Sequence, residues 1–258
     1  MKIVSNSALR SFVETKLYDD QSPRAIGKRI QKREKHLLRI SKNSIYRFIK
    51  SVHGRRIEAH RAKQKRRRKG RLGKRKGSLD GRTFIDQRPL SSNKRSRIGH
   101  VEADFIVSGK SGKGVLLVVV DRKSRVTFLE RIVTVRIIHV HRAFQRIQKR
   151  FPEMKTITTD NDLLLQKHKE LARILKVKIY FCDPYASWQK GTVENTNKYI
   201  RKFIPKGSSL AHYSSRFVRS LEDKLNRRIM ECLDYQTPEE ILRHSRKRKQ
   251  QRKSAVVK

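Results

Sequence analysis

The amino-acid sequence predicts a mixed α/β domain, built on a five-stranded sheet with helices and preceded by a small all-α domain. Three observations support this fold class. In the stretch 114–120, a glycine is followed by a continuous run of aliphatic, mostly β-branched side chains, which indicates a strand buried on both faces. Strand-like and helix-like stretches alternate after residue 132, and capped helical patterns occupy the chain before residue 53.

The first predicted domain, residues 1–53, consists of small helices. Ser22 followed by Pro23 is a favourable helix start, because serine caps the first turn and proline suits its first position. A second helix starts after Ser41, and its apolar side chains recur at the spacing of one helix face. The other face carries polar and basic side chains that we predict to contact DNA, namely Asn43, Ser44, Arg47 and Lys50.

Two short helices with such a face are typical of a helix-turn-helix that reads the major groove. The connection through residues 32–36 is longer than the tight turn of that motif. A plain helical hairpin is therefore the alternative.

Residues 54–97 are predicted to be a basic flexible linker. Their first half is nearly all charged and has too little apolar surface to fold alone. We expect it to follow DNA through phosphate contacts that weaken with salt, although a solvated spacer is the alternative. The densest run of basic side chains consists of Arg66, Arg67, Arg68 and Lys69.

Residues 98–246 carry the predicted core, followed by a basic, frayed tail over residues 247–258. Strands are expected at 101–107, 114–120, 125–132, 156–159 and 177–181. Helices are expected at 137–151, 166–175, 187–203, 213–232 and 238–246. A three-stranded meander followed by alternating helices and strands is the order of the ribonuclease-H-like, or retroviral-integrase-like, fold.

The charge of the chain predicts a nucleic-acid partner. It contains 66 Lys and Arg residues against 23 Asp and Glu residues, which gives a formal net charge of +43. No apolar stretch approaches the ~20 residues of a membrane span, and the N-terminus lacks the apolar region of a secretion signal. Two cysteines are too few for a disulfide framework.

Three acidic residues stand out in this basic chain because of the elements that carry them. Asp104 lies in the first core strand, Asp160 ends the fourth strand, and Glu194 lies near the start of a helix. Their separations, 55 and 33 intervening residues, leave room for the elements between them. Because the first and fourth strands are neighbours in this topology, we predict that the three converge as catalytic and metal-binding residues. The predicted cofactor is Mg²⁺ or Mn²⁺, with two ions per site serving phosphodiester chemistry.

Other charged residues near this triad have two interpretations each. Glu102 shares a strand face with Asp104, so it is either a ligand or a group that supports one. Lys198 and Arg201 follow Glu194 at helical spacing. We predict that they contact DNA phosphates, and ordinary salt bridges on a solvated face are the alternative.

At these residues the sequence resembles the insertion-sequence-30 family of bacterial DDE transposases. The most specific stretch is YFCDPYASWQKGTVENTN at residues 180–197. Further matches are RSRIGHVEAD at 95–104, TTDN at 158–161, FIPKG at 203–207, LNRR at 225–228 and LDYQTP at 233–238. At the N-terminus, Ser22-Pro23 and the run SIYRFI at 44–49 look like the helix-turn-helix of the family.

The resemblance implies metal-dependent strand cleavage and strand transfer at the inverted-repeat ends of an insertion sequence, with Asp104, Asp160 and Glu194 as the acidic triad. Expected partners are the terminal repeats, target DNA and further copies of the chain on DNA, with no membrane. The expected location is the nucleoid in a bacterial cytoplasm.

The chain also departs from the family pattern. Val101 and Ala103 stand where the family usually has Trp and Gly, and Asp162 replaces a turn glycine. The alternatives are an impaired transposase that acts as a DNA-binding repressor and a ribonuclease-H-type nuclease.

Overall fold

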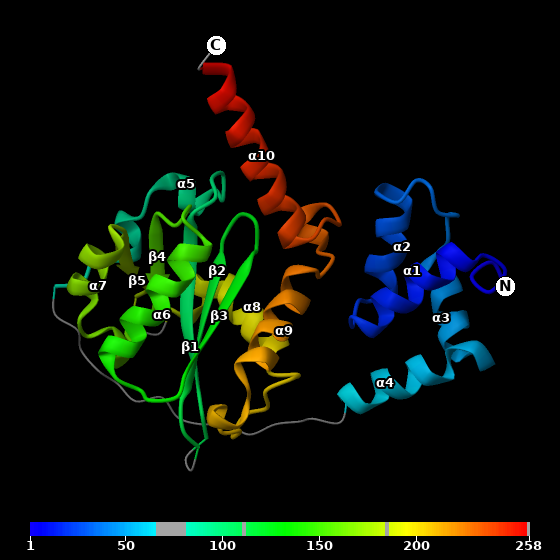
Figure 1. Ribbon diagram of the computed structural model, residues 1–258, viewed down its shortest axis with the longest axis horizontal. Helices are drawn as coiled ribbons and strands as arrows, with labels where there is room; N and C mark the ends of the chain where they lie inside the picture. Colours follow the sequence, from blue (N-terminus) through cyan, green and yellow to red (C-terminus); the bar gives the residue numbers. More distant parts are fainter. Residues whose placement is uncertain (66–80, 110–111, 184–185, 257–258) are drawn as a thin grey trace. The chain divides into compact units, whose positions relative to one another are not determined.

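The computed structural model describes residues 1–65, 81–109, 112–183 and 186–256. Contacts within the chain divide it into two compact units. The first unit comprises Met1–Arg68 and Lys224–Lys258, and the second comprises Lys69–Asp223. Figure 1 shows the strands β1 to β5 of the second unit and the helices of both.

The sheet of the second unit has five strands in the order β3-β2-β1-β4-β5. The strands are β1 (His100–Val107), β2 (Val115–Asp121), β3 (Thr127–Ile132), β4 (Thr156–Thr159) and β5 (Lys178–Phe181). The first three form an antiparallel meander, whereas β4 runs parallel to β1 and β5 runs parallel to β4. This is the ribonuclease-H-like arrangement, so the predicted fold class of the core is confirmed.

Helices cover both faces of this sheet. They are α6 (Ile137–Arg150), α7 (His168–Leu175), α8 (Gly191–Ile200) and α9 (Ser215–Asn226). Asp104 and Phe105 are neighbours on β1, so their side chains point to opposite faces. The Phe105 ring packs edge-on against Phe144 of α6, with ring centroids 6.5 Å apart. Asp104 contacts α8, and β2, which lies between β3 and β1, is buried along its whole length.

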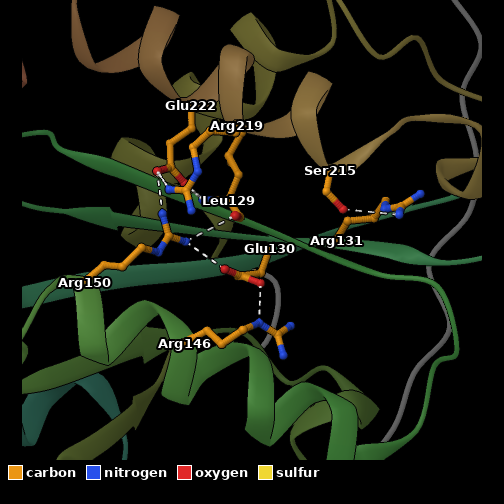
Figure 2. A network of polar contacts seen from close by, with 8 residues as sticks. All are labelled: Leu129, Glu130, Arg131, Arg146, Arg150, Ser215, Arg219 and Glu222. Atoms are coloured by element: carbon orange, nitrogen blue, oxygen red, sulfur yellow. Dashed lines mark hydrogen bonds and ion pairs between the residues drawn. The ribbon is translucent and has the colours of Figure 1, made fainter.

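The edge strand β3 is held by charged side chains (Figure 2). Glu222 of α9 is buried and accepts a hydrogen bond of 2.6 Å from the backbone N–H of Leu129. Arg150 joins this carboxylate to Glu130, with N–O distances of 2.5 and 2.8 Å. Glu222 thereby occupies a backbone donor that an edge strand otherwise leaves open, and it fixes α9 on the sheet.

The first unit begins with a bundle of helices. They are α1 (Ser7–Tyr18), α2 (Pro23–Lys32), α3 (Lys42–Lys50) and α4 (Arg55–Lys65). The hydroxyl groups of Ser22 and Ser41 each accept a 3.2 Å hydrogen bond from the first turn that follows, so both predicted helix starts are confirmed. The apolar faces of α2 and α3 lie in one core cluster. Their function as a helix-turn-helix stays a prediction.

The predicted linker is partly helical. Ile57 of α4 is 2% exposed and packs in the core cluster of the first unit, so the helical part extends past residue 53. Polar contacts add to this packing, because His60 lies 3.2 Å from Asp20 and Arg61 donates a hydrogen bond of 3.3 Å to the carbonyl of Gln21. The predicted domain boundaries themselves stay a prediction.

Two further helices differ from the expected ones. The segment 187–203 is not one long helix: a 3₁₀ turn, η4 (Ser187–Lys190), precedes α8. Gly191, a poor helix former, marks the change. The tail expected to fray is instead helical, because α10 runs from Pro238 to Val256. No glycine or internal proline interrupts that stretch, and acids lie in its first turn, where they suit the helix dipole.

The C-terminal segment docks on α2 within the first unit. The guanidinium of Arg29 donates hydrogen bonds of 2.6 and 2.7 Å to the carboxylate of Glu240, and one of 3.1 Å to the carbonyl of Tyr235. The Lys224 ammonium pairs with Asp20 at 2.6 Å. These contacts join positions about 200 residues apart in the sequence.

Short elements complete the described structure. They are α5 (Leu90–Asn93), η1 (Val52–Gly54), η2 (Ile85–Gln87), η3 (Leu163–Leu165), η5 (Leu210–His212) and η6 (Glu231–Leu233). Within the residues described, no helix has the length and apolarity needed to cross a membrane.

Candidate active site

Two of the three predicted carboxylates lie next to each other, one in β1 and the other directly after β4. Glu102 of β1 is in register with Thr158 of β4, and two residues further on the same strands lead to Asp104 and Asp160. The ammonium of Lys190 joins them: Nζ lies 3.0 Å from Asp104 Oδ1 and 3.0 Å from Asp160 Oδ2. The fold therefore brings both aspartates to one cation, which is a side chain of the protein itself.

Lys190 and Asn197 are site residues that the sequence analysis did not identify. Lys190 is only 3% exposed and ends η4, and Asn197 lies two turns further along, in α8. The Asn197 amide donates a hydrogen bond of 2.6 Å from Nδ2 to Asp104 Oδ2. A spacing of seven residues fits one helix face, but Lys190 lies in η4 and not in α8, so the spacing alone does not identify these two residues.

Glu194 lies on that same face, four residues after Lys190 and three before Asn197. It is half-buried in the first turn of α8. Within the described residues it makes no hydrogen bond or ion pair with Asp104 or Asp160, and no three His, Cys, Asp or Glu side chains gather closely enough to hold a metal ion. The aspartates are thus paired, with Glu194 on the helix that faces them, and the catalytic role of all three stays a prediction.

Several oxygen atoms around this pair lack a donor. Asp160 Oδ1, Asn161 Oδ1 and Asn197 Oδ1 are buried and accept no hydrogen bond from any residue that the structure describes. Leaving a buried acceptor unpaired costs about 1–3 kcal/mol. Carboxylate and amide oxygens are also the hard ligands that Mg²⁺ and Mn²⁺ accept. The surroundings of Asp160 therefore suit a cation in addition to the ammonium already present.

The electrostatics of the site depend on this ammonium. Burial raises the pKa of Asp104, although the charge of Lys190 opposes the shift. Burial lowers the pKa of Lys190, but the charges of Asp104 and Asp160 outweigh it, and the pKa lies above its ordinary value. Lys190 consequently remains a cation, and its charge opposes the effect of burial on Asp104.

Asp162 adds a fourth acid beside the pair. Its carboxylate accepts a hydrogen bond of 2.9 Å from the N–H of Leu164 and caps η3. Burial raises the pKa of Asp162, and the nearby charges of Asp160 and Asp104 raise it further. Its φ of −84° is accessible to any residue, so this conformation does not need the glycine that the family pattern has there.

Glu102 supports the site through the backbone. It is fully buried, forms an ion pair with Arg122, and accepts a hydrogen bond of 2.9 Å from the N–H of Val193 in the first turn of α8. A carboxylate in that position also suits the positive end of the helix dipole. Glu102 therefore holds α8 against β1, and with it Lys190 and Asn197. Of its two interpretations, the structure favours the supporting role.

The residues predicted to contact DNA are found in different environments. Asn43, Arg47 and Lys50 are exposed on α3, whereas Ser44 is half-buried with its hydroxyl 3.2 Å from that of Ser41. Lys198 is exposed on α8. The remaining predicted contacts, Arg66, Arg67, Arg68 and Lys69, lie outside the described residues.

Arg201 is half-buried and donates a hydrogen bond of 3.3 Å to the carbonyl of Pro205. Burial lowers its pKa, and the charge of Asp104 opposes the shift, which indicates that the guanidinium lies within electrostatic reach of the paired aspartates. Its role in DNA binding stays a prediction.

The sheet topology and the paired aspartates define a protein of the integrase-like class. Among known proteins, the chain is 34% identical to the transposase for insertion sequence element IS4351 of Bacteroides fragilis, over 93% of this chain and 74% of that protein. It is 33% identical to transposase InsI for IS30A of Escherichia coli K12, over 92% of this chain and 65% of that protein. The transposase for IS1086 of Cupriavidus metallidurans is 32% identical over 78% of this chain and 60% of its own length.

The chain belongs to the insertion-sequence-30 family of transposases, and the resemblance found in the sequence is confirmed. No family model matches it. Among solved structures, the catalytic core domain of BIV integrase is similar with a TM-score of 0.44 and 16% identity, over 58% of this chain and 97% of that one.

Proposed function

We propose that the chain cleaves and joins DNA strands at the inverted-repeat ends of an insertion sequence. The observation that carries this proposal is the pairing of Asp104, in β1, and Asp160, directly after the neighbouring strand β4, around one cation. The family relationship supports the same reaction.

The two aspartates offer oxygen ligands of the kind that a divalent metal ion prefers. Asp104 and Asp160 supply carboxylate oxygens, and Asp160 Oδ1 is a buried acceptor with no donor among the described residues. Glu194, from the facing helix, would be the third ligand. Bound Mg²⁺ or Mn²⁺, as a pair of ions, supplies activation of the attacking oxygen and stabilisation of the leaving oxygen.

The remaining residues prepare the carboxylates for that role. Lys190 neutralises both aspartates before metal binds, and Asn197 fixes the orientation of Asp104 through its amide. Glu102 anchors the helix that carries these groups. Since a metal ion bound by the same oxygens would compete with the ammonium, Lys190 is expected to move away from them when metal binds.

The DNA partners follow from charge and from the family. The formal net charge of +43 favours binding to phosphates along an extended duplex. We expect α3 to read the terminal repeats through Asn43, Arg47 and Lys50, and the basic region before the core to follow the backbone. We also expect a homo-oligomer on DNA, and a location with the nucleoid in the bacterial cytoplasm.

The direct test is Asp104→Asn in the full chain. With Mg²⁺ and a duplex that carries the terminal repeat, we expect strand cleavage to be lost while DNA affinity stays unchanged. Asp223→Asn, which changes an exposed acid of α9, is the matched control and should cleave normally. Cleavage by Asp104→Asn at the wild-type rate would contradict the assignment.

The same assay separates the alternative functions. A repressor without catalytic activity binds the ends but cleaves nothing in its wild-type form. A ribonuclease-H-type nuclease cuts RNA–DNA hybrids and shows no preference for the repeat.

A further inference from the structure

A cavity of about 430 Å³ lies beside the paired aspartates. Its wall includes Glu102 of β1, two residues before Asp104, and Gly191 at the start of α8, directly after Lys190. Segment 85–95, which precedes the core strands, supplies much of the remaining wall, including Arg88 and Arg95. Arg122, at the end of the β2 hairpin, completes the basic part of the lining.

The buried charges of this cavity do not cancel. Arg88 is 8% exposed and Arg122 is 6% exposed, whereas Glu102 is the one fully buried acid beside them. Glu102 pairs with Arg122. The partners of Arg88 are neutral: its guanidinium donates to Asn93 Oδ1 and to Thr158 Oγ1. Two buried cations thus share one buried anion, which leaves a positive charge to be balanced.

The other carboxylates of the lining do not remove this excess. Asp86 and Asp183 are exposed, so water screens them, and Asp183 accepts a hydrogen bond of 2.7 Å from Gln189. In agreement, burial and the neighbouring Arg122 lower the pKa of Arg88 to about 10. Arg95 adds a further guanidinium at the exposed side of the cavity.

Donors for an anion are available on these arginines. A guanidinium has five N–H groups in a planar fork that matches phosphate oxygens. Arg122 donates from Nε to the carbonyl of Ser92 and from Nη1 to Glu102, and its Nη2 has no acceptor among the described residues. The side chain of Arg95 likewise has no hydrogen-bond or ion-pair partner in the part of the chain that the structure describes.

The position of the cavity indicates which phosphate would enter it. Glu102 and Asp104 are two residues apart on β1, which corresponds to about 7 Å along a strand. A DNA strand that presents one phosphodiester to Asp104 and Asp160 therefore brings a neighbouring one to the arginines. The volume lies within the ~300–1,000 Å³ range of small-ligand sites, so it admits a nucleotide as well as its phosphate.

We propose that Arg88, Arg95 and Arg122 form a binding site for a phosphodiester group of the DNA. This group belongs to the strand that is cleaved and is a neighbour of the phosphodiester at the cleavage position. This inference rests on the proposed function. Arg88 and Arg122 supply the buried positive charge, and Arg95 contacts the phosphate from the exposed side. The site would fix the position of the strand relative to the aspartates without touching the reacting atoms.

The test measures whether the effect of one arginine on DNA affinity depends on one phosphate of the DNA. A duplex carrying the terminal repeat is prepared with single phosphates near the cleavage position replaced, one at a time, by neutral methylphosphonates. The DNA affinity of the full chain is measured without metal, so that cleavage does not interfere. The variants are Arg95→Gln, which changes an exposed residue and should fold normally, and Lys94→Gln as the matched control. Lys94 is exposed and adjacent in sequence, but does not line the cavity.

For the wild type we expect one methylphosphonate next to the cleavage position to weaken binding about tenfold, in line with a lost charge-assisted contact. In Arg95→Gln the same replacement should matter less than twofold, and in Lys94→Gln it should again cost about tenfold. A tenfold effect that persists in Arg95→Gln overturns the proposal, as does a wild type insensitive at every position. If free inorganic phosphate weakens DNA binding but no single methylphosphonate does, the site binds phosphate but not the strand, and the proposal is also overturned.

This outcome is independent of the catalytic assignment. If the coupling is absent while the wild type still cleaves the unmodified duplex with Mg²⁺, only the phosphate site is wrong. If the unmodified duplex is never cleaved, the proposed function fails whatever the coupling shows.

Discussion

Replacing Lys190 by Met removes the cation between Asp104 and Asp160 and keeps the length of the side chain. In the metal-free protein this leaves two neighbouring carboxylates without the group that neutralises them. Breaking a fully buried ion pair costs about 3–5 kcal/mol. Here the side chains of Asp104 and Asp160 are 21% and 34% exposed, so solvent reduces the effect, and we expect about 2 kcal/mol.

A loss of this size is measurable as a melting temperature. One kcal/mol corresponds to about 2–4 °C for a unit of this size, so Lys190→Met should melt about 4–8 °C below the wild type in EDTA. Mg²⁺ should restore much of the difference, because a ligand at 100 times its Kd adds about 2.7 kcal/mol. In the wild type Mg²⁺ should stabilise less, since it must displace the ammonium.

The assay is thermal unfolding of the full chain, followed by circular dichroism with EDTA or with Mg²⁺. Lys198→Met, which changes an exposed lysine of the same helix, controls for the loss of one surface charge and should leave both melting temperatures unchanged. The reasoning is refuted if Lys190→Met is as stable as the wild type in EDTA, or if Mg²⁺ stabilises the two proteins equally.

Two other changes test the support of the site and the docking of the C-terminal segment. Glu102→Gln leaves the buried Arg122 without its anion and weakens the hydrogen bond that holds α8 on β1. We therefore expect the free energy of unfolding, measured in urea, to fall by about 3 kcal/mol, and strand cleavage to become much slower. Normal values for both would contradict this role. Burial raises the pKa of Glu240, but hydrogen bonds from Arg29 and Thr237 and the charge of Arg29 outweigh it and lower the pKa to about 2. Because this folded-state pKa is below the ordinary value of 4.5, the pair stabilises the first unit above pH 4.5, and its contribution of about 3 kcal/mol is lost as pH falls from 4.5 towards 2. Relative to the intrinsic exchange rate at each pH, the protection of α2 against hydrogen exchange should therefore fall over this range in the wild type and depend less on pH in Glu240→Gln; identical profiles of protection against pH would exclude the pair as the cause.

The strands and their order were predictable because their signals are local. The aliphatic run at 114–120 and the short β-branched stretch at 156–159 each mark a buried strand, and the meander followed by crossovers leaves few topologies. The proximity of Asp104 and Asp160 followed from that topology. Ser22 and Ser41 likewise predict the starts of α2 and α3, because each serine caps its helix through one local hydrogen bond.

What the sequence did not reveal depends on contacts between distant residues. Nothing near Lys190 indicates that its ammonium lies between two aspartates, and a lysine after a tryptophan and a glutamine reads as a surface residue. The ion pair of Arg29 with Glu240 spans more than 200 positions, so no local pattern in the sequence could predict it. The break between η4 and α8 has a weak local cause in Gly191 and a stronger long-range one, the hydrogen bond from Val193 to Glu102.

The central claim is that Asp104 and Asp160 hold a divalent metal ion together with Glu194. The most direct measurement is an anomalous difference map from crystals of the full chain soaked in Mn²⁺. We predict a peak within about 2.0–2.6 Å of an oxygen of each aspartate and of Glu194, with the Lys190 ammonium displaced from them. A map with no peak there, and with Lys190 still bridging the two carboxylates at saturating Mn²⁺, would contradict the claim.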